Sequence, residues 1–200
     1  MSLPIEPALQ ALTRRLGGVL FSALQAPTEP GPPLLQAPAA LPIAPALLAR
    51  SHPGTAARQS AQGLYTRCLA HFRQGAQQAA VHDDIGLAAA YFVLANLDAL
   101  HDLHPDETAL AQVERQMRHA LRHLAGWQSA PLRERQSAFE QLAVIGVLVA
   151  ESAAAARTQG PVAQAHVQQA ARAYLVRWLG INPDGLTLGP QGLALELAAA

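Results

Sequence analysis

The chain has 200 residues, of which 50% are hydrophobic, 14% charged and 4% aromatic, and its formal net charge is zero. This length allows one domain with a substantial core plus a flanking segment. A neutral chain without lysine offers no electrostatic basis for binding nucleic acid or an anionic membrane. The scarcity of β-branched runs predicts an all-α fold with almost no strand, and a single cysteine, Cys68, excludes an internal disulfide.

Residues 1–25 form the first predicted element. Apolar residues at alternating intervals of four and three predict an amphipathic helix, with the stripe Ile5, Leu9, Leu12, Leu16, Val19 and Ala23. A second interpretation is a weak signal peptide, because Arg14 and Arg15 precede an apolar run that ends near Ala26. Export to the periplasm or the medium and a cytoplasmic location therefore stand as alternatives.

Residues 26–54 form a proline-rich arm that contains more than half of the prolines in the chain. Proline removes backbone donors and fixes φ, so we expect an extended segment without a helix longer than a turn or two. Its leucines are too apolar for a free tether. We therefore expect the arm to lie partly along the surface of the domain that follows.

Residues 55–188 are predicted to form the helical domain, a compact bundle of five helices, and residues 189–200 a tail or weak terminal helix. Capping residues, prolines and glycines set the predicted helices at about 56–79, 85–101, 105–126, 131–160 and 161–180. The first is expected to turn Leu64, Cys68, Leu69, Phe72 and Ala76 inward, with Cys68 a small buried hydrophobe. Residues 186–188 are expected to be extended.

The segment 142–150 is apolar on every side, which is typical of a core helix or a membrane span. Nine residues give about 14 Å of helix, whereas a bilayer needs about 20 residues. We therefore predict the central helix of a water-soluble bundle and no membrane span. Gly146 costs helix propensity in its middle, which indicates close approach of a neighbouring helix.

The pattern between Asp83 and Gly192 resembles a known family. Asp83 precedes an Ala-rich helix, Asn96 lies within VLANLDAL, and RQSAFEQLAVIGVL and ARAYLVRWLGINPDGLTL follow. Together these segments resemble a proteobacterial family of all-helical proteins filed as a domain of unknown function. The resemblance implies an all-helical fold and favours an exported protein, and it implies no catalytic residue and no cofactor.

Histidines suggest one candidate metal site. His119 and His123 are four residues apart on one helix, a spacing that lets two imidazoles bind one ion. An antiparallel hairpin would bring His82 and Asp84 beside them, which completes a four-residue candidate site. The competing interpretation is a solvated polar face, because both helical histidines lie about 200° from core residues among Gln112, Arg115, Gln116 and Arg122.

Three polar residues near the apolar helix form a second candidate site. Glu140 lies one turn after Gln136 at the start of the apolar stretch. Because buried polar groups need partners, we expect Glu140 to hydrogen-bond Asn96 in a structural role. If a cleft opens there, Asn96, Gln136 and Glu140 are the expected polar binding residues.

The sequence contains no phosphate-binding glycine loop, nucleophile elbow or Cys-x-x-Cys motif. The favoured prediction is therefore a non-catalytic helical module that binds another protein, in connection with a secreted or cell-envelope system, without nucleic acid or cofactor. A homodimer stays open. The alternative is a small metal- or ligand-binding helical protein.

Overall fold

The computed structural model describes Leu24, Leu34 and residues 41–78, 83–179 and 182–195. These residues form six α-helices and a two-stranded sheet, so the predicted all-α class is confirmed at that level. In chain order the elements are α2 Ala44–Ala49, α3 Thr55–Gln78, α4 Ile85–His101, α5 Glu107–His123, α6 Leu132–Gln159, α7 Pro161–Leu179, a 3-10 turn Pro183–Gly185, β1 Leu186–Gly189 and β2 Gly192–Leu195. The amphipathic stripe predicted in residues 1–23 lies outside the described residues.

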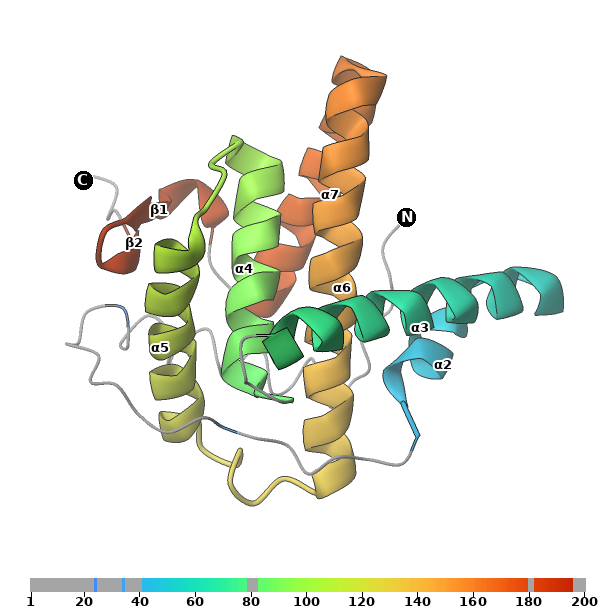
Figure 1. Ribbon diagram of the computed structural model, residues 1–200, viewed down its shortest axis with the longest axis horizontal. Helices are drawn as coiled ribbons and strands as arrows, with labels where there is room; N and C mark the ends of the chain where they lie inside the picture. The colour runs from blue at the N-terminus through green and yellow to red at the C-terminus, as the bar shows by residue number, and fades with distance from the viewer. Residues whose placement is uncertain (1–23, 25–33, 35–40, 79–82, 180–181, 196–200) are drawn as a thin grey trace.

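Helix α6 occupies the centre of the fold, with α4 beside it, α3 crossing it and α7 behind (Figure 1). Every residue from Ser137 to Val147 is buried, which confirms the predicted core helix. Gly146 is where α4 comes closest. A Cβ atom there would lie 2.9 Å from Cδ1 of Tyr91 and 3.2 Å from Cα of Phe92, so the predicted close approach is also confirmed.

The length and composition of α6 alone would let it cross a membrane, but 67% of its most apolar 18-residue window is buried inside the protein. A buried core helix meets the same length and hydropathy criteria. The apolar stretch of this helix was predicted to span nine residues, which is too short. Its apolar character continues through the Ala-rich segment after Glu151.

Helix α3 buries a slightly different stripe from the predicted one. Cys68, Leu69, Phe72 and Ala76 are buried as expected, together with Tyr65, whereas Leu64 is 39% exposed. The N-terminal half of α3 projects beyond the other helices (Figure 1). Few other helices lie beside this half of α3. Sequence periodicity alone therefore wrongly places Leu64 among the buried residues.

Helix α2 lies within the predicted proline-rich arm and packs against α3 and α6. It has six residues, within the expected limit of two turns, and Ala44, Leu48 and Ala49 are buried in the common core. Upstream, Leu24 and Leu34 are partly buried against the same core, and the Leu34 carbonyl accepts a hydrogen bond from the Ile85 amide at 3.3 Å. Leu34 and α2 therefore pack against the core of the helical domain.

The C-terminal hairpin corrects the prediction for residues 189–200. Residues 192–195 form strand β2, antiparallel to β1, with Leu186 opposite Leu195 and Gly189 opposite Gly192. Gly192 has φ of +96°, a conformation that favours glycine at the end of the two-residue turn. The helix-like composition of residues 193–195 is overridden by this turn and by docking against α5.

Gln116 on α5 holds the hairpin in place. The sequence placed it on a solvated face, but it is 4% exposed. Its side-chain amide donates to the Leu193 carbonyl at 2.9 Å and accepts from the Leu193 amide at 2.8 Å. The side chain of Gln116 thus serves as a second hydrogen-bonding partner of β2, after β1.

Replacing Gln116 by alanine should lower the free energy of unfolding by about 2 kcal/mol, because both backbone groups of Leu193 lose their partner. Gln112→Ala, one turn earlier on α5, should change stability by less than about 0.5 kcal/mol. Urea denaturation of both variants measures the difference. Equal effects would contradict the assigned role of Gln116.

Candidate functional site

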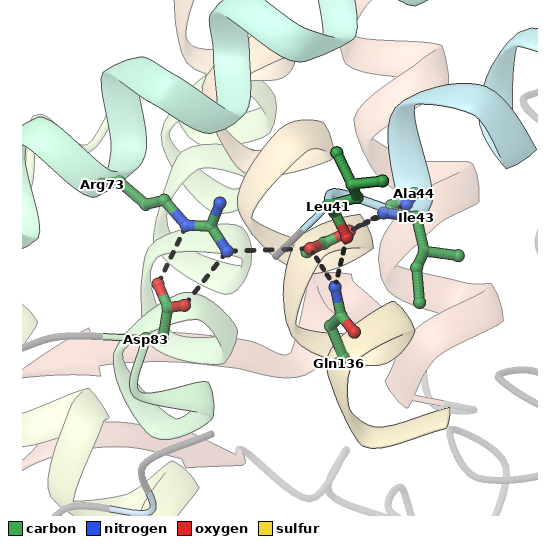
Figure 2. Close-up of polar contacts among 7 residues, drawn as sticks. Leu41, Ile43, Ala44, Arg73, Asp83 and Gln136 are labelled. Carbon is green, nitrogen blue, oxygen red and sulfur yellow. Dashed lines mark hydrogen bonds and ion pairs between the residues drawn. The ribbon is translucent and has the colours of Figure 1, made fainter. Parts of the chain in front are cut away.

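Glu140 on α6 is the centre of a buried polar cluster, drawn in Figure 2. Its side chain is fully buried, and Oε2 accepts hydrogen bonds from the backbone amides of Ile43 at 2.7 Å and Ala44 at 2.8 Å. Gln136 donates from Nε2 to Oε1 of Glu140 at 2.8 Å and to the Leu41 carbonyl at 3.0 Å. One carboxylate therefore joins the first turn of α2 to the central helix.

Arg73 on α3 supplies the positive charge nearest to this carboxylate, with Nη2 3.7 Å from Oε1 of Glu140. The guanidinium also donates two hydrogen bonds to Asp83, each at 3.0 Å, and lies 5.8 Å from the ring centroid of Phe139. The cluster thus joins the arm, α3, the start of α4 and α6. Its geometry is that of a structural joint, because its polar atoms point at one another.

The predicted contact between Glu140 and Asn96 is wrong. Asn96 is fully buried on α4, and its Nδ2 donates to the Phe92 carbonyl one turn back at 2.7 Å. Its Oδ1 has no hydrogen-bond partner among the described residues. The sequence correctly indicated that both side chains are buried. It could not show that the amides at the start of α2, in the arm, are the hydrogen-bond donors to Glu140.

Tyr65 anchors the segment after α2, because its hydroxyl is 2.9 Å from Nε2 of His52. Burial, followed by the smaller influences of Tyr174 and Cys68, raises the pKa of Tyr65 from 10.0 to about 12. The fold favours the neutral phenol. Its contribution to stability is therefore intact below pH 10 and is lost as the pH rises through about 12.

Raising the pH from 9 to 11 should lower the free energy of unfolding of the wild type more than that of Tyr65→Phe, which has no proton to lose. The full contribution of Tyr65 is at most about 3 kcal/mol. Denaturation midpoints at the two pH values measure the effect. Identical losses in the two proteins would show that Tyr65 does not titrate as described.

The structure describes three of the four residues of the predicted histidine site, Asp84, His119 and His123. Asp84 is fully buried, caps α4 by accepting from the Gly86 amide at 2.7 Å, and accepts from Nε of Arg118 at 2.7 Å. His119 and His123 stack with ring centroids 4.4 Å apart, and His123 is exposed. Burial, followed by His123 and Arg122, lowers the pKa of His119. His82 lies outside the described residues, and Asp84 is directed toward Arg118.

A different group of metal-ligating types lies at the end of α4. Asp98, Asp102 and His104 each offer an atom within 4.8 Å of the others, and they form the one such group in the described part of the chain. Arg157 on α6 already pairs with both carboxylates, at 2.9 Å from Oδ2 of Asp98 and 2.9 Å from Oδ1 of Asp102. An ion would therefore compete with a guanidinium.

The comparisons with known proteins give one result. Residues 24–196 match a protein family described as "Family of unknown function (DUF6683)". The chain belongs to this family. The predicted membership of a family of unknown function is thereby confirmed, and the match extends beyond residues 83–192 to the arm and α2. No curated protein and no solved structure matches the chain.

This DUF6683 chain also has an open apolar cleft of about 570 Å³, where α3, α4, α5 and α6 meet. Its apolar lining comprises Phe72 and Ala76 of α3, Leu87 and Tyr91 of α4, Leu110 of α5 and Val147 of α6. The sequence does not reveal this cleft, because each of these residues fits a core stripe of its own helix. None of Asn96, Gln136 and Glu140 lines it.

A second surface without a described partner lies on the hairpin of α6 and α7. The C-terminal end of α6 extends past α4 (Figure 1). Between Ser152 and Ala171 the one formally charged side chain is Arg157, which is paired with Asp98 and Asp102. Val162 at the start of α7 is 70% exposed. The hairpin therefore presents an exposed, Ala-rich surface nearly free of charge.

Proposed function

We propose that the protein is a non-catalytic helical module that binds another protein through the hairpin of α6 and α7. The observation that carries this proposal is the near absence of charge over residues 152–171 of the hairpin, of which seventeen are exposed or half-exposed. Interface cores are depleted in charged side chains, whereas ordinary solvated helices are rich in them. The role requires no cofactor and no nucleic acid.

Two features of the whole chain support the same reading. The helices from α3 to α7 act as one compact five-helix body, and the proline-rich arm is held to it through α2 and Glu140. The buried carboxylates of Glu140 and Asp84 have structural roles in this bundle, since Glu140 holds α2 and Asp84 caps α4. We propose that the module works in water, exported or cytoplasmic, and spans no membrane.

The test is capture of a partner by full-length protein from an extract of the source organism. A hairpin variant with Ala155→Glu, Val162→Glu and Ala165→Glu should lose the captured protein. A matched variant with Ala56→Glu, Ala57→Glu and Ala70→Glu on exposed positions of α3 should retain it. The same capture by both variants, or no capture by the wild type, would contradict the proposal.

A second candidate function is the binding of a small ligand, which the apolar cleft favours because ligand sites are of similar size, roughly 300–1,000 Å³. The sequence also suggested metal binding as an alternative function, and the structure gives it weaker support. Asp84 is paired with Arg118, and Asp98 and Asp102 are paired with Arg157.

A further inference from the structure

We propose that the cleft where α3, α4, α5 and α6 meet binds a small uncharged molecule with an apolar body and one hydrogen-bonding head group. This site uses other residues than the α6–α7 hairpin, so it does not depend on the proposed protein interaction. Its evidence is the volume, the lining and the charge of the cleft.

The hollow exists because small residues of α3 face large half-buried ones of the neighbouring helices. Gly75 and Ala76 contribute almost no side-chain volume, and a Cβ atom on Gly75 would meet nothing within 4 Å. Across from them, Leu87, Tyr91 and Leu110 line the cleft and are only half-buried. Three large apolar side chains thus converge on a space that no described residue fills.

Buried apolar side chains form the floor of the cleft. Phe72, 7% exposed, and Val147, 2% exposed, close it from below. Phe72 packs edge-on against Tyr91, with ring centroids 5.7 Å apart, which fixes both rings. An apolar body entering the cleft would therefore meet preformed walls, so binding would require little rearrangement.

The polar groups of the lining select against a charged head. His71 and Glu107 are the ionisable side chains of the lining besides Tyr91, and both are exposed at its rim. Glu107 would repel a carboxylate, and no arginine among the described residues lines the cleft to attract one. Tyr91 has no hydrogen bond to another described residue, and burial raises its pKa, so its phenol stays neutral and can hydrogen-bond an alcohol or an amide.

The experiment is a titration of ¹⁵N-labelled full-length protein with 1-hexanol, 1-octanol and 1-decanol, followed by NMR. Amide shifts should cluster at residues 71–76 and 107–110. Affinity should rise about fourfold for each added methylene, as expected for burial of an alkyl chain. Octanoate should bind about fivefold more weakly than 1-octanol because of the charge at the rim.

Filling the cleft from Gly75 provides the decisive variant. Gly75→Leu should weaken 1-octanol binding at least tenfold, and Gly75→Ala, which reaches less far, should weaken it less. Neither should lower stability, because the site is helical and open. Gly63→Leu is the matched control on the same helix, since a Cβ atom there meets only Nη1 of Arg67 at 3.8 Å. It should bind as the wild type does.

Several results would overturn the proposal. These are no binding of any alcohol, affinity independent of chain length, shifts confined to other residues, tighter binding of octanoate than of 1-octanol, or unchanged binding by Gly75→Leu. Loss of capture by the hairpin variant would leave these results unaffected, so failure of one proposal is distinguishable from failure of the other.

Discussion

Replacing Glu140 by alanine should lower the free energy of unfolding by about 3–5 kcal/mol, the largest single effect expected outside the apolar core. The substitution removes the acceptor for the Ile43 and Ala44 amides and for Gln136. It also leaves Arg73 without its second carboxylate. Limited proteolysis should cut the variant in the arm, near α2, at protease concentrations that leave the wild type intact.

Glu140→Gln separates charge from shape. Its amide oxygen can accept from Ile43 and Ala44 as Oε2 does now, but its NH₂ group would face the donors of Gln136 and Arg73. We therefore expect about half of the loss seen with alanine. Glu151→Ala on the same helix is the control, since Glu151 is exposed and should change stability by less than about 0.5 kcal/mol. A Glu140→Ala effect as small as that of Glu151→Ala would contradict the assigned role.

The second large effect is expected at Gly146. Gly146→Leu should cost about 3 kcal/mol, because even a Cβ atom there meets the Tyr91 ring at 2.9 Å and the Phe92 backbone at 3.2 Å. The backbone of α4 can yield only by moving away from α6. Gly146→Ala should cost about 1–2 kcal/mol by the same mechanism.

Gly63 provides a control whose expected sign is opposite. Gly63→Ala should stabilise the protein by up to about 1 kcal/mol, since alanine favours the helix and nothing crowds that position. Urea denaturation of both alanine variants compares them directly. Stabilisation by Gly146→Ala would show that α4 does not press on α6 there.

Much of the fold follows from periodicity and helix-end signals. The uniform apolar stretch of α6 identified it as the core helix, and Gly146 marked the helix contact. Asp84 accepts from a backbone amide at the start of α4, so the predicted beginning of this helix at residue 85 had a physical basis. Helix α5 begins two residues later than predicted, because Asp106 accepts from the Ala109 amide and caps it. These signals are local, which is why the sequence alone reveals them.

The partners of the polar residues did not follow from the sequence. Glu140 bonds an arm helix about a hundred residues away in the chain, and Gln116 bonds a strand that composition alone suggested to be a tail or helix. Both pairings depend on which segment arrives beside a buried polar group. The same holds for the apolar cleft, whose lining comes from four helices and is recognisable only once they are assembled.

The account depends on residues 137–147 of α6 being sealed from solvent by other helices of the same chain. Amide hydrogen exchange of these residues in dilute, detergent-free, monomeric protein tests it most directly. These amides should exchange only through global unfolding, with opening free energies equal to the free energy of unfolding measured by denaturation. Fast exchange in the monomer, or protection that appears only with detergent or on self-association, would contradict it.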